Sequence, residues 1–295
     1  MEPLTQNYFV GVDGGGTKCK ARLENEYGDL LGEGLSGPCN PAQSAETAFT
    51  SIIEATTQAL EAASIPALQL KDLNVCLGLA GVNVPRYRAT AESWILPFKY
   101  THITTDLHIA CVGAHAGKDG AIIITGTGSS AVASLSGTLT NIGGHGFPLG
   151  DKAGGAWLGL RALQYTLESL DSLMPSSNLV IRICEALGTS DPQEIVGKSL
   201  HYKSNDFGKF APVVVKCAID NDPVARAIVE EGKEYLCEIV SRLNKLGAKR
   251  IAMIGGLSSQ WAQWLPENIK EQLQPAICSP EFGAVSLVKH VVKER

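Results

Sequence analysis

Two glycine-rich loops, each placed directly after a short apolar run, are the segments of this sequence most suited to chemistry. The first consists of Asp13, Gly14, Gly15, Gly16 and Thr17, and the second of Thr125, Gly126, Thr127, Gly128 and Ser129. Glycine lets the backbone approach an anion without a Cβ in the way, so its N–H groups are available to phosphate oxygens. Nearby hydroxyls add further donors. One such loop is commonly only a turn, but two in matching contexts predict a nucleotide phosphate chain held from both sides.

A carboxylate and a third glycine break add to this prediction. Asp13 closes the first apolar run, where it could hold a water on a nucleotide-bound Mg²⁺; the alternative is an Asx turn that stabilises the bend. Gly255 and Gly256 follow the apolar residues 251–254. That break suits close packing against a flat adenine ring, and a strand-to-helix connection explains it equally well. The three loops together indicate a nucleotide site more sharply than any one of them.

The elements that must position these loops alternate between strand and helix character. Apolar runs predict strands at residues 8–12, 20–24, 30–35, 73–79, 102–105, 121–125, 130–135 and 250–254. Helical periodicity predicts helices from a Ser44 cap to residue 63, across residues 157–170, and from Asp222 and Pro223 to Gly247. The order strand, Gly/Thr turn, strand occurs twice, which we interpret as an internal duplication with a junction near residues 110–118. This opening differs from a dinucleotide-binding unit, in which a helix follows the first strand.

Composition and charge narrow the class of protein. The 295 residues are 44% hydrophobic and 19% charged, which is typical of a soluble α/β protein of about two domains. The net charge of −5 and the lack of a basic cluster argue against nucleic-acid binding. No apolar run is long enough for a membrane span, and residues 1–7 lack a secretory apolar stretch, so a cytoplasmic protein is expected. The eight cysteines include no Cys-x-x-Cys pair, so no zinc ribbon or redox motif is predicted.

These motifs resemble those of the superfamily that contains acetate kinase, sugar kinases, Hsp70 and actin. Residues 13–17, 125–130 and 254–257 match its first phosphate, second phosphate and adenosine motifs. Residues 109–116 and 282–291 match its two connecting helices, where small residues let the helices cross. Within the superfamily the chain is similar to the BadF/BadG/BcrA/BcrD-type ATPases, in the branch of N-acetylglucosamine kinase and bacterial glucosamine kinase. Further similarity to the bacterial enzyme lies in residues 147–151, 159–161, 206–210, 222–223 and 253–256.

The resemblance implies an α/β fold of two ribonuclease H-like (actin-like ATPase) domains, each with a central mixed sheet. ATP and sugar would bind in the cleft between the domains. The expected domains are residues 1–115, with the sugar side and the first phosphate loop, and residues 116–295, with the second phosphate loop and the adenosine site. The final helix is a candidate to return to the N-terminal domain.

The resemblance also implies an ATP- and Mg²⁺-dependent kinase that phosphorylates the 6-hydroxyl of a small-molecule amino sugar, glucosamine or N-acetylglucosamine. Asp106 matches the family's catalytic base, and Asp13 would bind Mg²⁺ through water. The implied ATP-binding residues are Asp13, Gly14, Gly15, Gly16, Thr17, Lys18, Gly126, Thr127, Gly128, Ser129, Ala218, Gly255, Gly256 and Ser258. The implied sugar-binding residues are Asn40, Asp106, Ser129, Ser130, Gly144, His145, Gly146 and Asp151. Homodimers are common in the family, although no residue here identifies an interface.

Three departures from the family pattern lie near the implied sugar site. Lys152, after the loop aspartate, stands where relatives usually have an acidic or amide residue. Ser130, after the second phosphate loop, replaces an asparagine or cysteine, and Ala80 replaces a serine of the N-acetylglucosamine enzymes. An isolated histidine such as His145 in a glycine loop is also more often a surface residue than a ligand. These features leave the identity of the sugar open.

Two other classes of function remain as alternatives. One is an ATPase activator of a 2-hydroxyacyl-CoA dehydratase-type system, which would bridge an iron–sulfur cluster between two subunits. The scattered cysteines speak against it. The other is a non-enzymatic sugar or nucleotide sensor, which would usually carry an added DNA-binding segment.

Overall fold

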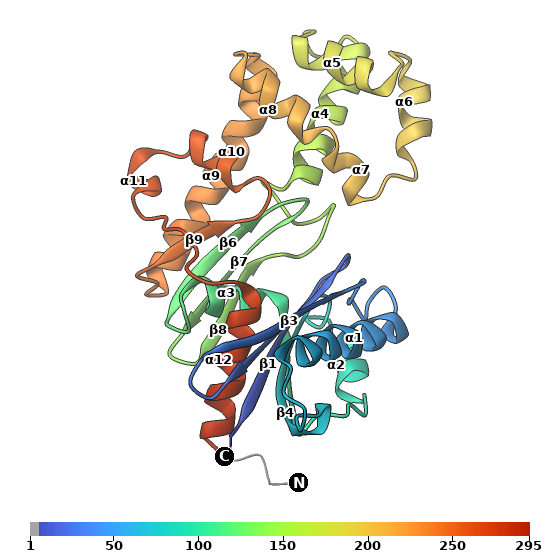
Figure 1. Ribbon diagram of the computed structural model, residues 1–295. Helices are drawn as coiled ribbons and strands as arrows, with labels where there is room; N and C mark the ends of the chain where they lie inside the picture. The colour runs from blue at the N-terminus through green and yellow to red at the C-terminus, as the bar shows by residue number, and fades with distance from the viewer. Residues whose placement is uncertain (1–5) are drawn as a thin grey trace. The chain divides into compact units, whose positions relative to one another are not determined.

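The structure, a computed structural model, describes residues 6–295, which divide into two compact units (Figure 1). Unit 1 contains the chain up to Gly120, the short stretch Ser134–Leu139 and the C-terminal segment Pro275–Arg295. Unit 2 contains Ala121–Ala133 and Thr140–Gln274. The described residues form one five-stranded and one four-stranded sheet, both accompanied by helices. The predicted α/β class with two sheets is confirmed.

The sheet of unit 1 has the strand order β3-β2-β1-β4-β5. Its strands are β1 (Tyr8–Gly14), β2 (Cys19–Asn25), β3 (Leu30–Ser36), β4 (Leu73–Leu79) and β5 (Tyr100–Thr105). The first three strands form an antiparallel meander, whereas β1 is parallel to β4 and β4 is parallel to β5. Because parallel neighbours end at the same edge, the carboxyl ends of β1, β4 and β5 lie together.

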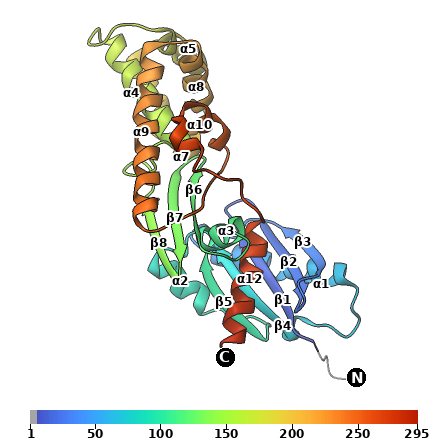
Figure 2. The ribbon, with the colours of Figure 1, turned by 90° about the vertical axis from the view of Figure 1, so that its left-hand side faces the viewer.

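Helices pack on both faces of this sheet (Figures 1 and 2). They are α1 (Ala45–Ala63) on one face, α3 (Asp106–Ala114) and α12 (Pro280–Lys293) on the other, and the short η1 (Leu70–Asp72) and α2 (Pro85–Glu92). Successive side chains of β1 pack into two hydrophobic cores, one on each face of the sheet, because strand side chains alternate between faces. Val10 packs in the cluster that contains Ile52 of α1, whereas Phe9 packs with Ile109 and Val285 of the other two helices.

Glycines let α12 approach both the sheet and α3. A Cβ on Gly11 would lie 2.0 Å from the carbonyl oxygen of Glu281, and a Cβ on Gly283 would lie 2.0 Å from that of Ile109. Any larger side chain would force these elements apart. The C-terminal helix therefore begins directly beside the strand that leads into the first glycine loop.

Unit 2 combines the strand order β8-β7-β6-β9 with a set of helices. Its elements are β6 (Gly120–Thr125), β7 (Ser129–Leu135), β8 (Thr138–Gly143), α4 (Gly155–Leu170), α5 (Asn178–Leu187), α6 (Pro192–Ser199), α7 (Ser204–Gly208), α8 (Ala211–Ile219), α9 (Pro223–Lys245), β9 (Ile251–Ile254), α10 (Ser258–Trp264) and α11 (Glu267–Lys270). In the parallel pair β6–β9, Ile124 lies opposite Ile254, so the loops that follow the two strands are neighbours.

All predicted strands and the three predicted helices are present, with their ends shifted slightly. Ser44 and Asp222 cap α1 and α9 as expected, since each side chain accepts a hydrogen bond from a first-turn N–H group. The half-exposed strand β8 and the short helices α2, α5–α8, α10 and α11 were not predicted. Packing against other elements, more than local periodicity, stabilises helices of this length.

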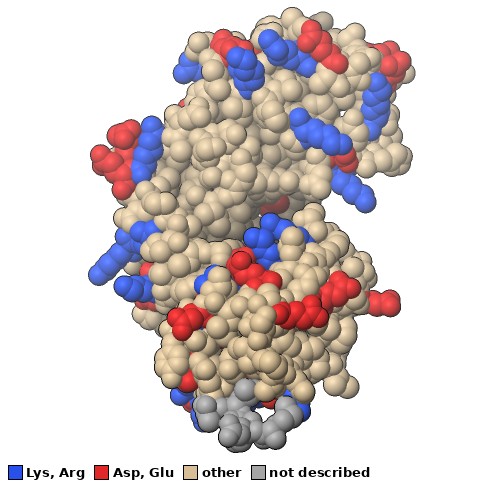
Figure 3. All heavy atoms as spheres, viewed as in Figure 1, with Lys and Arg blue, Asp and Glu red and all other residues tan. Residues whose placement is uncertain are grey.

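Neither the charged side chains in view in Figure 3 nor the described cysteines indicate a binding site. On the face of each unit in view in Figure 3, acidic and basic side chains are interspersed. None of the described helices is both long and apolar enough to cross a membrane. Five cysteines are buried, and within residues 6–295 no three His, Cys, Asp or Glu side chains are grouped so as to hold a metal ion.

Candidate active site

The carboxyl edge of the unit 1 sheet brings together the two acidic residues that the sequence singles out. Asp13 on β1 lies opposite Gly78 on β4, and Gly78 lies opposite Thr104 on β5. Asp106 follows β5 as the first residue of α3. The two carboxylates interact, because the charge of Asp106 is one of the causes that raise the pKa of Asp13. Ligands of open α/β sheets commonly bind at this edge.

The first phosphate loop is a tight turn that also anchors the segment before Asn40. The Gly15 N–H donates to the Lys18 carbonyl at 2.9 Å, and the Cys39 N–H donates to the Gly15 carbonyl at 2.8 Å. Asn40 Oδ1 lies so close to Gly81 that a Cβ there would be 2.6 Å away. Two segments far apart in the sequence thus hold the Asn40 amide at the same sheet edge.

Asp106 is held at the start of α3, where Thr105 provides the cap. Thr105 Oγ1 accepts the His108 N–H at 3.1 Å, so the capping role that could explain a polar residue here belongs to the threonine. Asp106 Oδ1 accepts the Leu107 N–H at 2.9 Å. Burial raises the pKa of Asp106, while the backbone N–H groups of Leu107 and of Asp106 itself oppose that shift. A fixed carboxylate with a raised pKa is suited to accept a proton from a hydroxyl.

Asp13 lies among charges that favour a cation. Burial, followed by the charges of Glu281 and Asp106, raises the pKa of Asp13 to about 6, against the opposing effect of Lys18 and Lys20. A nearby cation would relieve this repulsion between carboxylates. Mg²⁺ usually takes one or two protein carboxylates and keeps waters and nucleotide oxygens as its other ligands. The residues present therefore fit a nucleotide-bound Mg²⁺ beside Asp13.

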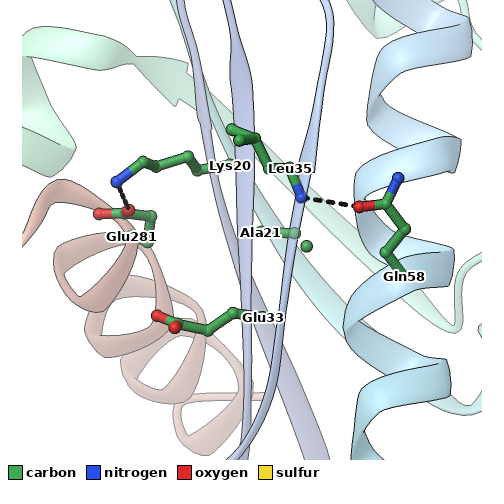
Figure 4. Close-up of a pocket in the computed structure, with 7 residues that line it drawn as sticks. Lys20, Ala21, Glu33, Leu35, Gln58 and Glu281 are labelled. Carbon is green, nitrogen blue, oxygen red and sulfur yellow. Dashed lines mark hydrogen bonds and ion pairs between the residues drawn. The ribbon is translucent and has the colours of Figure 1, made fainter.

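Glu281, at the start of α12, is a neighbour of Asp13 that the sequence analysis missed. Its Oε1 pairs with Lys20 Nζ at 3.3 Å, its side chain is 8% exposed, and its Oε2 has no hydrogen-bond partner among residues 6–295 (Figure 4). No local signal could have found Glu281, because only the packing of α12 on β1 brings it near Asp13.

Figure 4 shows the cavity of about 310 Å³ that Lys20 and Glu281 help to line. Its other lining residues are Ala21, Glu33, Gly34, Leu35 and Gln58. None of the predicted ATP- or sugar-binding residues lines this cavity. It is therefore separate from the candidate site, although Glu281 belongs to the surroundings of both.

The second phosphate loop, in unit 2, is held by the first turn of α4. The N–H groups of Gly155 and Ala156 donate to the carbonyls of Gly126 and Thr127 at 2.8 and 2.9 Å. The buried Ser129 hydroxyl donates to the carbonyl of Lys152. These hydrogen bonds fix the backbone conformation of the loop, and the Ser129 hydroxyl contributes one of them.

The predicted adenosine loop lies beside the predicted second phosphate loop because β9 is parallel to β6. The Leu257 N–H donates to the Thr125 carbonyl at 2.9 Å, and the Ser258 hydroxyl donates to the Gly255 carbonyl at 2.8 Å. Gly255 has a φ of +102°, and a Cβ there would lie 2.3 Å from the Thr125 carbonyl oxygen. By contrast, a Cβ on Gly256 would meet no described atom within 4 Å.

These two neighbouring glycines allow a matched stability test. Gly255→Ala is expected to lower the free energy of unfolding by about 2 kcal/mol or more, because the new methyl group meets a backbone carbonyl and the φ is unfavourable. Gly256→Ala is expected to change it by less than about 0.5 kcal/mol. Urea denaturation of both variants beside the parent protein measures the difference. Equal stability of the two variants would contradict the close approach of the two loops.

Asp151 in the predicted sugar loop folds back on the second phosphate loop. It adopts a φ of +62°, unusual for a residue with a side chain. Its Oδ1 accepts the Gly146 N–H at 3.2 Å, and its Oδ2 lies 2.3 Å from where a Cβ on Gly128 would be. Burial raises the pKa of Asp151, whereas the Gly146 N–H and His145 lower it. Aspartate adopts this conformation more readily than most residues, because its short side chain can form local hydrogen bonds.

Other predicted sugar residues gather around the same loop. Ser130 packs against Gly144, where a Cβ would lie 2.9 Å from the Ser130 Cβ. The Tyr235 hydroxyl of α9 lies 2.8 Å from where a Cβ on Gly143 would be, and Asp151 contributes to the raised pKa of Tyr235 after burial. Tyr235 carries no sequence signal, since it joins the loop only through the packing of α9.

The contacts of Lys152 and the burial of Ala218 could not be predicted from the sequence. Lys152 Nζ pairs with Glu231 at 2.9 Å and lies 5.8 Å from the ring centroid of Trp157, so its charge is balanced by α9. Ala218 is 1% exposed inside the helical core. His145 is exposed.

A cavity of about 720 Å³ in unit 2 brings the second phosphate loop and the sugar loop together. Its lining residues are Thr127, Gly128, Gly146, Phe147, Pro148, Asp151, Leu160, Ser199, Leu200, Tyr202, Lys203, Ser204, Asn205 and Phe207. Residues 199–205 were missed as site residues. The resemblance at residues 206–210 was the one signal that pointed to this neighbourhood, and it assigned no role.

Comparisons with known proteins agree with this arrangement of motifs. The chain is 32% identical to the glucosamine kinase GspK of Vibrio cholerae over 279 residues, which cover 95% of this chain and 93% of the relative. It is 25% identical to the N-acetyl-D-glucosamine kinase of Dictyostelium discoideum, covering 96% of this chain and 98% of that protein.

A solved structure extends the similarity to three dimensions. The crystal structure of a candidate N-acetylglucosamine kinase from Chromobacterium violaceum superposes with a TM-score of 0.84 at 30% identity, covering 96% of this chain and 99% of that one. A ROK family glucokinase from Streptomyces griseus, at 18% identity and a TM-score of 0.52, shares the fold. The sequence profile of the BadF/BadG/BcrA/BcrD ATPase family matches residues 10–287, and the chain belongs to this family.

Proposed function

We propose that the protein transfers the γ-phosphate of ATP to the 6-hydroxyl of glucosamine or N-acetylglucosamine. The coarser part, phosphotransfer from ATP to an amino sugar, is supported by family membership and by relatives that are named glucosamine kinase and N-acetylglucosamine kinase. The observation that carries the proposal is the partly buried Asp106 carboxylate, held at the same sheet edge as Asp13 and Asn40.

Asp106 would act as the base in this reaction. Its free oxygen accepts the proton of the sugar hydroxyl while that hydroxyl oxygen attacks the γ-phosphorus and the bond to the β,γ-bridging oxygen breaks. The Leu107 N–H orients the other oxygen, and burial keeps the carboxylate basic. Phosphoryl transfer depends more on positioning and charge than on base strength, so orientation is the larger part of the role of Asp106.

The glycine loops would hold the nucleotide. Backbone N–H groups within residues 14–18 and 126–129, other than those of Gly15 and Gly126, which donate within their own loops, are proposed to bind the phosphates. Gly255, Gly256 and Ser258 are proposed to lie against the adenosine. Asp13 would hold Mg²⁺ through water, and the ion would neutralise the phosphate charge during transfer. We leave Ala218 out of the adenine site because its side chain is 1% exposed.

The sugar would be held by side chains that the structure keeps rigid. Asn40 and Asp106 are proposed to bind hydroxyls on the unit 1 side. Asp151, Ser130 and the backbone of residues 144–146 are proposed to bind the remaining hydroxyls. A carboxylate pinned by the Gly146 N–H can accept from two hydroxyls, whose fixed geometry selects one sugar orientation.

A coupled assay of ADP release over a panel of hexoses and hexosamines tests the proposal. Glucosamine or N-acetylglucosamine is expected to stimulate ADP release by at least about tenfold over ATP alone, and glucose less, because binding energy from the amino substituent improves orientation. Phosphorus NMR of the product distinguishes 6-phosphate from other esters. Lack of stimulation by every sugar would overturn the proposed function.

A further inference from the structure

The cavity beside the sugar loop has a second wall that the proposed monosaccharide site does not use. One wall consists of Thr127, Gly128, Gly146 and Asp151, and the other runs from Ser199 at the end of α6 through Phe207 in α7. All of these residues belong to unit 2. The cavity volume of about 720 Å³ falls in the range of roughly 300–1,000 Å³ that holds drug-sized ligands. It has room for more than one sugar ring.

Aromatic rings form the apolar part of the cavity lining. Phe147 and Phe207 have ring centroids 5.0 Å apart, and Tyr202 meets Phe207 edge-on at 5.6 Å. All three rings are only partly buried and line the cavity. Tyr202 also stacks on the buried Phe210 with ring centroids 6.4 Å apart, so the rings form one packed cluster whose uncovered parts line the cavity.

Polar groups surround the rings on the second wall. Ser199, Lys203, Ser204 and Asn205 all line the cavity. A sugar ring has apolar C–H faces and hydroxyls around its edge, so flat aromatic faces bordered by hydrogen-bonding groups suit it. An adenine base also stacks on aromatic rings. The kinetic test below distinguishes the two ligands, because Thr127 and Gly128 of the proposed phosphate loop also line the cavity.

We propose that the acceptor site continues into this cavity, which binds a second sugar ring linked to the amino sugar that is phosphorylated. The proposal rests on the proposed function and adds a substrate class to it: amino-sugar disaccharides. Tyr202 and Phe147 provide the stacking faces, and Asn205 and Lys203 bind hydroxyls of the second ring.

Kinetics with acceptors of one and two rings test the proposal. The probes are glucosamine, N-acetylglucosamine and N,N′-diacetylchitobiose, assayed with the parent protein and the variants Tyr202→Ala and Asn205→Ala. We expect the disaccharide to have a kcat/KM within about tenfold of the better monosaccharide. Tyr202→Ala should lower the ratio of kcat/KM for disaccharide over monosaccharide by about tenfold or more, and Asn205→Ala by about threefold. Calorimetric titration with the disaccharide should show the same order of affinities without turnover.

A control variant and three outcomes complete the test. Tyr27→Ala removes a ring that is 79% exposed in unit 1 and should leave the ratio unchanged. A parent protein that phosphorylates monosaccharides but neither binds nor phosphorylates the disaccharide overturns the extended site and leaves the proposed function standing. A raised KM for ATP in Tyr202→Ala with an unchanged acceptor ratio overturns it as well, and assigns the cavity to the nucleotide. If no sugar is phosphorylated, the proposed function fails, and disaccharide binding in the calorimeter alone decides whether the cavity binds sugars.

Discussion

Asp106→Asn is expected to lower kcat by about 10²- to 10⁴-fold, the usual contribution of a positioned general base. Asparagine keeps the size and the bond from the Leu107 N–H, which the amide oxygen can accept, but it cannot take up a proton. The KM for ATP and the melting temperature should stay close to those of the parent protein. Steady-state kinetics with saturating sugar, together with calorimetric titration of ATP, measure both parts of the expectation.

A control separates loss of the base from loss of charge in general. Asp171 is exposed at the C-terminal end of α4, so Asp171→Asn removes one negative charge away from the site and should leave kcat within about twofold. If Asp106→Asn retained more than about a tenth of parental kcat, Asp106 would not be the base.

Asp13→Asn is expected to lower kcat/KM for MgATP by about 10- to 100-fold, as removal of an outer partner of a metal usually does. Raising the Mg²⁺ concentration should recover part of this loss, because the ion would still bind to the nucleotide phosphates. Activity of the parent protein should also fall as the pH drops through about 6, where the Asp13 carboxylate becomes protonated. A variant that kept both full activity and the parental Mg²⁺ dependence would remove Asp13 from the metal site.

The same substitution should stabilise the ligand-free protein. The pKa of Asp13 is raised from 3.8 to about 6 in the fold, so the folded state binds the proton more tightly than the unfolded state. The folded state therefore loses stability as the pH rises from about 4 to about 6, and the full cost remains above that pH. Asp13→Asn removes this cost, about 3 kcal/mol at pH 8, and the gain should shrink towards pH 4. Urea denaturation without nucleotide at the two pH values measures it.

The stability gain would distinguish function from fold. A residue kept for packing destabilises the protein when it is replaced, whereas a carboxylate kept for a ligand costs stability until the ligand binds. Lower stability of Asp13→Asn at pH 8 would show that the neighbouring Lys18 and Lys20 outweigh burial and the charges of Glu281 and Asp106.

The local features of the site could be predicted from the sequence because each depends on a few adjacent residues. A buried strand that ends in glycines is recognisable from adjacent residues alone, so the loops at Asp13, Thr125 and Gly255 were evident. Ser44 and Asp222 cap helices through bonds within their own first turn. Matching loops in both halves of the chain also indicated the fold, because they resemble a superfamily whose domains are built this way.

The surroundings of those loops depended on contacts between distant segments, which only the tertiary structure decides. Glu281 and Lys20 affect Asp13 because Gly11 admits the backbone of α12, a contact that links the two ends of the chain. Tyr202 and Asn205 face the sugar loop because the segment from α6 to α7 packs beside it, and no periodicity in that segment indicates a cavity. The sequence by itself thus determined the prediction of where phosphate and base chemistry lie, since that prediction needs only local backbone geometry and a carboxylate. The charges around Asp13 and the cavity beside the predicted sugar loop were decided by packing, because burial and cavities exist only once separate elements meet.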